Sequence, residues 1–179
     1  AYRVLVENLT GTLQVIARDA KVQVDFNPNV VAKFRLLGYE NRALANQDFR
    51  NDTVDAGEVG AGHNVTALYE IKLKEEASSG DALTVYVRYQ DPDSSKVSEI
   101  AQRFARSQFR GAFEATSPSF QLAAAVAEFS EILRQSYWAK DSSLENVQGL
   151  AQRVKQALPQ DKDVAEFAQL VSRASQLRR

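Results

Sequence analysis

The only histidine of this 179-residue chain, His63, is the first residue to consider for chemistry. The chain contains no cysteine and no HExxH-type pattern, so nothing accompanies His63 in the way that a zinc site requires. One histidine and no GxSxG elbow also leave few ways to build a nucleophile–base set. The sequence therefore predicts a loop histidine, no bound metal and no catalytic turnover from this chain.

Three glycines close to His63 (Gly57, Gly60 and Gly62) could be read as a phosphate-binding loop. Loops of that kind follow a strand and open a helix, whose N-terminal amides hold the anion. Here the glycines are followed by alternating apolar and polar residues from Val65 to Leu73, broken only by Leu68. That pattern is typical of a half-buried strand. We therefore interpret the glycines as a structural turn that leads into a strand.

Composition excludes several classes of protein. The net charge is -1 and the pI is about 6.0, so no basic footprint for nucleic acid is present. Hydrophobic residues make up 44% of the chain, but no segment is apolar for long enough to cross a bilayer. The length fits one domain, or a domain with a substantial appendage. Because the chain contains no methionine, we expect a processed product or a piece of a longer protein.

The first half of the chain is predicted to contain one helix and then several strands. Residues 2–17 show helical periodicity, which predicts an amphipathic helix. Residues 20–26, 30–39, 65–73 and 83–89 read as strands separated by turns. Strands without intervening helices predict an antiparallel β-sandwich, immunoglobulin-like or similar, in an α+β protein. Its inner face is predicted to include Val22, Val24, Phe34, Leu36, Tyr69, Ile71, Val85 and Val87.

The second half is predicted to be mainly helical. Four apolar residues in 97–104 fit one helical face, although Gly111 and scattered aromatic residues leave 97–115 open. Ser117 and Pro118 are a strong helix start, and the helix is expected to run to Ser136. Its buried face is predicted to comprise Leu122, Val126, Phe129, Leu133 and Tyr137, with Trp138 covering its end.

Two further helices are predicted after this one. The first begins at Ser142 or Ser143 and ends at Pro159, and the second begins at Asp161 or Asp163. We expect the helices to pack on the sandwich, so that the chain unfolds as one cooperative unit.

Several motifs occur in the order that is typical of one bacterial family. They are VxFNP at Val24–Pro28, FRLLGYENRAL at Phe34–Leu44, DFRND at Asp48–Asp52, DAGEVGAGHNVTALYEI at Asp55–Ile71 and SPSFQLAAAVAEFSEILRQS at Ser117–Ser136. Together they resemble the uncharacterised C-terminal domain that follows the A domain in bacterial von Willebrand factor type A (VWA) proteins. The resemblance covers most of the chain.

The resemblance implies a domain layout. Residues 1–18 would be the last helix of an upstream VWA domain, 19–95 the β-sandwich, and 96–179 a mainly helical cap. VWA domains bind a divalent ion through a DxSxS motif, of which Asp93-Ser94-Ser95 and Asp141-Ser142-Ser143 supply only a part. A divalent ion is therefore expected only in the upstream domain, and no cofactor in this chain.

Two functions remain open. The first is a non-catalytic accessory module that supports protein–protein interaction or adhesion in the bacterial cell envelope, periplasmic or extracellular. This module would contact its own upstream VWA domain and an unknown protein partner. A cytoplasmic location is the alternative. The second is a carbohydrate-binding or hydrolytic sandwich that uses surface carboxylates. Two carboxylates with shifted pKa in a pocket would favour the second, and an exposed apolar patch the first. The candidate interaction or structural loop residues are Tyr39, Glu40, Asn41, Arg42, Gly60, Gly62 and His63.

Overall fold

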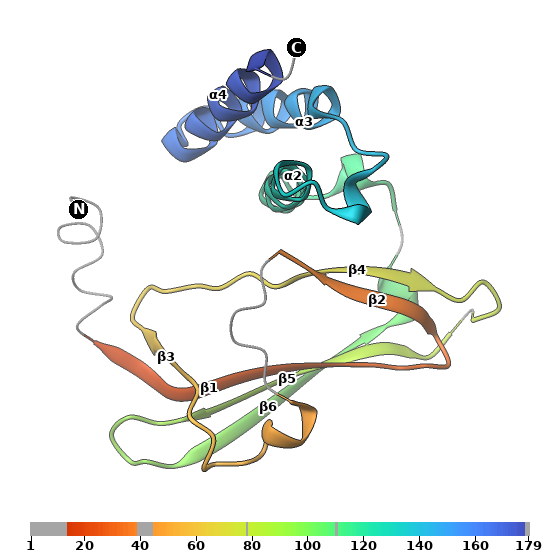
Figure 1. The fold of residues 1–179 in the computed structure, drawn as a ribbon. Coiled ribbons are helices and arrows are strands. Elements are labelled where there is room, and N and C mark those ends of the chain that lie inside the picture. The colour runs from red at the N-terminus through yellow and green to blue at the C-terminus, as the bar shows by residue number, and fades with distance from the viewer. Residues whose placement is uncertain (1–13, 39–44, 78, 110, 178–179) are drawn as a thin grey trace. The chain divides into compact units, whose positions relative to one another are not determined.

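The computed structural model shows an α+β protein in which two sheets precede three helices, which confirms the predicted class (Figure 1). The structure describes residues 14–38, 45–77, 79–109 and 111–177. The chain divides into a sheet unit, Ala1–Arg35 with Glu40–Phe109, and a helical unit, Leu36–Tyr39 with Arg110–Arg179. Each unit is described by itself.

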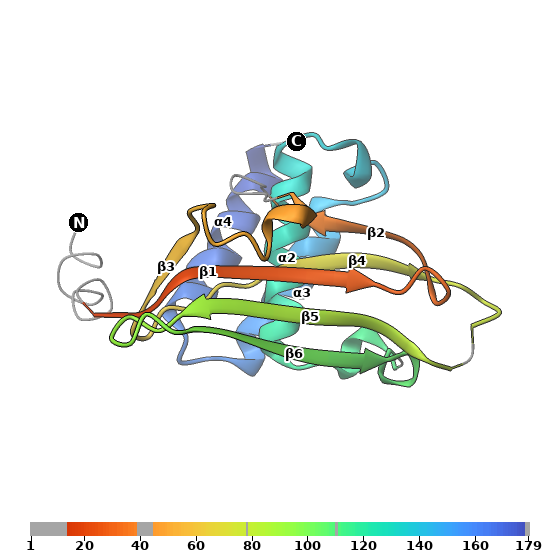
Figure 2. The same ribbon diagram turned by 90° about the horizontal axis from the view of Figure 1, so that it is seen from below.

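The larger sheet of the sheet unit has the strand order β3-β1-β5-β6 (Figure 2). Its strands pair antiparallel throughout. They are β1 (Val15–Phe26), β3 (Gly57–Gly60), β5 (Asp81–Gln90) and β6 (Val97–Ala105).

The start of β1 corrects the helix predicted for the N-terminal segment. Residues 15–18, which the sequence placed at the end of that helix, are strand. Val15 pairs with Gly60 and Ala17 with Val59, so pairing with β3 outweighs the helical periodicity there. Residues 1–13, which carry the rest of that prediction, lie outside the described residues.

A β-bulge in β1 also corrects the predicted inner face. Asp19 has φ +48°, in the left-handed region, and the pairing with β5 shifts register between Arg18 and Lys21. A bulge adds a residue to one strand and so redirects the side chains that follow it. Lys21 is consequently buried, whereas Val22, predicted to face inward, is 63% exposed.

Strand β6 corrects the second half of the predicted layout. The apolar spacing in 97–104 fits a helix, but these residues pair regularly with β5, from Gln90↔Val97 to Leu83↔Phe104. The four-stranded sheet therefore continues to Ala105 instead of ending near residue 95.

The second sheet pairs β2 (Val31–Leu37) with β4 (Leu68–Leu73). The predicted strand 65–73 thus begins three residues late, and Val65 is 93% exposed. Phe34 was predicted to lie inside but is 57% exposed, and its ring stacks on Phe26 of β1 at 3.9 Å between centroids. The other predicted inner-face residues are partly buried. The strand order does not establish an immunoglobulin-like sandwich.

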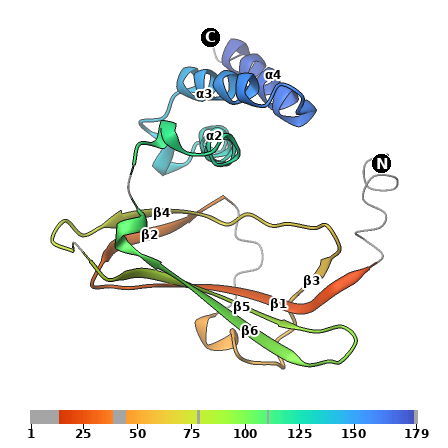
Figure 3. The same ribbon diagram turned by 180° about the vertical axis from the view of Figure 1, so that it is seen from behind.

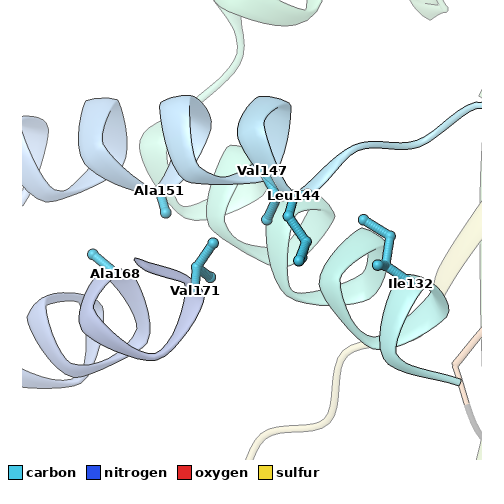
Figure 4. Packing of buried hydrophobic residues seen from close by; sticks show 6 residues of the cluster. All are labelled: Ile132, Leu144, Val147, Ala151, Ala168 and Val171. Atoms are coloured by element: carbon cyan, nitrogen blue, oxygen red, sulfur yellow. The ribbon is translucent and has the colours of Figure 1, made fainter. Parts of the chain in front are cut away.

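The helical unit contains α2 (Pro118–Leu133), α3 (Leu144–Ala157) and α4 (Lys162–Leu177). Their starts confirm the local signals, because Ser117, Ser143 and Asp161 each accept a hydrogen bond from a first-turn amide. Side chains from all three helices meet in one apolar cluster (Figure 4). The cluster comprises Ile132, Leu144, Val147, Ala151, Ala168 and Val171.

The buried face of α2 differs from the predicted one. Ala125 and Ile132 are buried and Phe129 packs against the cluster, edge-on to Phe167 at 5.8 Å. By contrast, four residues predicted to be covered are exposed: Val126, Leu133, Tyr137 and Trp138. Apolar residues lie on two sides of this helix, and the side that carries Phe129 and Ile132 packs against the cluster.

Replacing the N-cap of α2 is expected to lower stability modestly. In Ser117→Ala, the Phe120 amide loses its 3.2 Å acceptor, so the free energy of unfolding should fall by about 1 kcal/mol. Urea unfolding followed by circular dichroism measures the change. Ser119→Ala, two positions into the same helix, is the matched control, and an equal loss there would contradict the capping role.

Candidate functional site

A set of long-range polar contacts in the sheet unit involves residues 45–56, here called the strap. The strap covers one face of the four-stranded sheet, and β2 and β4 lie on the other side (Figures 1 and 3). Phe49 anchors it, since its side chain is buried and meets the Tyr86 ring edge-on at 6.3 Å. Lys21 Nζ donates to the Asn51 carbonyl at 2.6 Å. The sheet thus holds the strap through one aromatic contact and one buried cation.

Ion pairs fix the strap further along. Arg50 donates two hydrogen bonds to Glu99 of β6, at 3.1 and 2.7 Å. Arg88 of β5 donates to both carboxylate oxygens of Asp52, at 2.8 and 3.0 Å, and lies 3.6 Å from Glu99. The hydrogen bond from Arg50 lowers the pKa of Glu99, and the same bond raises the pKa of Arg50. Positive and negative charges alternate here, so the network is internally compensated.

A shallow depression adjoins the network, lined by Asp19, Lys21, Asp52, Arg88, Tyr89, Gln90 and Val97. Its charged groups already have partners, since Asp19 accepts from the Ala56 amide at 3.2 Å and Arg88 binds Asp52. Glu99 and Asp91 both have lowered pKa values, the latter through hydrogen bonds from Ser94. A general acid at neutral pH needs the opposite shift. The contacts of Lys21, Asp19 and Arg88 with residues 51, 56 and 52 hold the strap on the sheet.

Within residues 14–38, 45–77, 79–109 and 111–177, no group of three His, Cys, Asp or Glu side chains is arranged to hold an ion. Within those same ranges, no helix is both long and apolar enough to cross a membrane.

Of the loop residues predicted from sequence, the three that the structure describes do not join this network. Tyr39, Glu40, Asn41 and Arg42 lie outside the described residues. Gly60 is buried in β3, Gly62 takes φ +78° in the following turn, and His63 is exposed. The His63 amide donates to the Gly60 carbonyl at 3.0 Å, so residues 60–63 form a turn, whereas Gly57, read as part of the same turn, lies in β3. None of these three residues lines the depression.

The network residues themselves were missed from sequence, although one signal was available. Arg88 interrupts the apolar and aromatic run from Val85 to Tyr89, and Arg50 and Asp52 fall within the DFRND motif. Charged residues on a strand that faces another segment require partners. That requirement could have linked the motif to β5.

Acid is expected to weaken the attachment of the strap through Glu99. A carboxylate whose folded pKa is lowered stabilises the fold fully above its unfolded pKa, ordinarily 4.5, and loses this contribution as pH falls through the lowered value. Arg50→Gln removes the main cause of the shift. Its free energy of unfolding should therefore fall less than that of the wild type between about pH 7 and pH 3.

Urea unfolding across that pH range measures the difference. Lys33→Gln removes one positive charge from an exposed position of β2 and should keep the full acid dependence. Equal acid dependence in Arg50→Gln and the wild type would show that the Arg50–Glu99 pair does not stabilise the strap.

These features define a class: an α+β domain with a strapped antiparallel sheet, followed by a three-helix unit. The chain belongs to the family described as "Uncharacterized protein YfbK, C-terminal", whose model matches residues 11–177. It is similar to the uncharacterized protein YfbK of Escherichia coli (strain K12), with 33% identity over 187 residues that cover 97% of this chain and 32% of that protein. The chain thus spans about a third of the length of that relative. No solved structure matches it significantly.

Proposed function

We propose that this chain is a non-catalytic C-terminal accessory module of a bacterial VWA-domain protein and supports protein–protein interaction in the cell envelope. Membership of a family defined as a C-terminal region supports the first part, as does coverage of only a third of a longer relative. The motifs from Val24 to Ser136 support the link to a VWA domain. A cytoplasmic location remains the alternative, and cell fractionation of the full-length parent distinguishes the two.

One observation carries the interaction role: an apolar row on the sheet face opposite the strap. Val22, Val87 and Ile100 are aligned across β1, β5 and β6 by the strand register. Val22 is 63% exposed and Ile100 is 59% exposed, and Val87 between them is partly buried. Apolar side chains that adjoin one another on an exposed surface mark interaction sites more often than isolated ones do. We assign this row to a protein contact, with the upstream VWA domain as the first candidate.

The experiment compares the full-length parent with a Val22→Thr/Ile100→Thr variant. Threonine keeps the branched shape but adds a hydroxyl, so the β-strands should persist while the apolar contact weakens. Chemical cross-linking should join this region to the VWA domain or to a partner protein in the wild type, and the yield should fall several-fold in the variant.

Val65→Thr, at a loop position that is 93% exposed, is the matched control and should keep the wild-type yield. Unchanged cross-linking in the double variant would refute the assignment of the apolar row. A parent that lacks residues 14–179 tests the larger claim, because it should lose every partner that depends on this region.

The alternative, a carbohydrate-binding or hydrolytic site built on surface carboxylates, has weaker support. Asp19 and Asp52 line the same depression, but a backbone amide binds the first and Arg88 binds the second. Glycan binding or hydrolysis that disappears in Asp19→Asn and Asp52→Asn would favour this alternative over the interaction module.

A further inference from the structure

Strand β6 forms an edge of the four-stranded sheet, and its outer side pairs with no strand among the described residues (Figure 2). It is nine residues long, contains no proline and pairs with β5 without a bulge from Leu83↔Phe104 to Gln90↔Val97. Residues 99–103 are all exposed. Natural proteins usually protect long regular edges, because the free amides and carbonyls are a template for another strand. The opposite edge, β3, has only four residues.

Backbone hydrogen bonds show which residues of β6 present their polar groups at this edge. The Lys96 carbonyl accepts from Asp91 at 2.9 Å and the Arg106 amide donates to Gly80 at 2.8 Å, so even-numbered positions point toward β5. In an antiparallel ladder the alternate residues point away. Consistent with this, the Ala105 amide bonds to the Gln108 side chain rather than to β5. The outward set is therefore Val97, Glu99, Ala101, Arg103 and Ala105.

We propose that β6 is a self-association edge, at which a second copy of this chain adds its own β6 antiparallel about a two-fold axis at Ala101. In this register every outward residue faces an outward residue of the other copy, so outward amides meet outward carbonyls. Within one chain the Ala105 amide donates to Gln108 and the Arg103 carbonyl accepts from Gln102, so these two side chains give way when the second strand pairs. Ala101 meets Ala101, Val97 meets Ala105, and Glu99 meets Arg103 on both sides of the axis. The strand is thus complementary to itself in backbone and in charge.

The positions of the charged residues favour this strand register over the registers with the axis one residue to either side. A shift of the axis to Ile100 or Gln102 would set Glu99 opposite Ala101 or Ala105 instead of Arg103. Opposite charges placed directly across a strand pair are favourable, and they fix register more than affinity. Glu99 also binds Arg50 of its own chain, so the second contact extends an existing network. A single strand pair buries less than the roughly 1,200 Å² of a stable interface, so the association should be weak and concentration-dependent.

This contact is separate from the apolar row proposed above. Ala101 and Arg103 alternate with Ile100 along β6, so their side chains lie on the opposite face of the sheet from Ile100. Loss of self-association and loss of a VWA or protein partner are therefore distinguishable by variant.

The test is sedimentation of the full chain from roughly 1 to 500 µM, where the wild type should shift from monomer toward dimer. Ala101→Pro removes an outward amide and leaves the ladder with β5 intact, so it should weaken dimerisation about tenfold or more. Arg103→Glu sets like charges opposite each other and should weaken it several-fold. Lys96→Glu makes the same change of charge in the hairpin and should dimerise like the wild type.

A cysteine pair reports the register directly, because the natural chain has no cysteine. At the two-fold axis the Ala101 Cα atoms should lie about 5.5 Å apart, within the range for a disulfide. Ala101→Cys should therefore cross-link on mild oxidation several times faster than Ile100→Cys on the other face. A monomer at every concentration overturns the proposal, as does equal cross-linking of the two cysteines. If Ala101→Pro does not fold, Arg103→Glu and the two cysteine variants still test whether β6 is the self-association edge.

Discussion

Phe49→Ala is expected to lower the free energy of unfolding of the sheet unit by about 3–5 kcal/mol. Phe49 is the apolar anchor of the strap, 4% exposed and edge-on to Tyr86. Its removal leaves a cavity over the sheet, and the Lys21 amine and the two ion pairs of the strap lose the segment that orders them. Urea unfolding, with hydrogen exchange at the strap amides, measures the loss.

Phe34→Ala is the matched control within the same unit. Phe34 is 57% exposed and contributes mainly its stacking on Phe26, so the expected loss is about 0.5–1.5 kcal/mol. A loss in Phe34→Ala as large as that in Phe49→Ala would mean that the strap is not a principal source of stability.

Predictions that depended on short-range chemistry agree with the structure. Ser117, Ser143 and Asp161 start their helices because a cap needs only a side chain and an amide two or three residues later. The turn after β5 was also readable, since the Asp91 carboxylate accepts from the amides of Asp93 and Ser94. Signals of this kind lie within a few residues of sequence and need no tertiary partner.

Predictions that depended on distant contacts were less successful. The helical spacing of Val97, Ile100 and Phe104 gave way to pairing with β5. Residues 99–103 are exposed on both faces of the strand, so no buried face imposes an alternating pattern there. Lys21 and Val22 exchanged faces at a bulge that rests on Asp19, a non-glycine residue in the left-handed region. Nothing local in the sequence marks that bulge.

In the candidate site, too, local features could be predicted from the sequence and long-range contacts could not. The turn at Gly60–His63 follows from its glycines, but Gly57, read as part of the same turn, pairs with β1 as a strand residue. The Arg50–Glu99 and Arg88–Asp52 pairs join residues 49 and 36 positions apart. Pairing of that kind depends on the strand order, which periodicity alone does not provide.

Leu144→Ala is expected to lower the free energy of unfolding of the helical unit by about 2–5 kcal/mol. Leu144 is 4% exposed and lies at the first turn of α3, where it meets Ile132 of α2 in the apolar cluster (Figure 4). Leu133→Ala is a demanding control, because the sequence placed Leu133 on the buried face and the structure leaves it 59% exposed. Its loss should stay within about 0.5 kcal/mol.

The same variants test whether the chain unfolds as one cooperative unit, as the sequence analysis predicted. Trp138, the only tryptophan, reports on the helical unit by fluorescence, and hydrogen exchange at β5 reports on the sheet unit. If the two units unfold together, the loss of unfolding free energy caused by Phe49→Ala should also appear in the unfolding transition reported by Trp138. The loss caused by Leu144→Ala should likewise appear in the hydrogen exchange of β5. Two transitions that move independently would contradict that prediction while leaving both cavity effects intact.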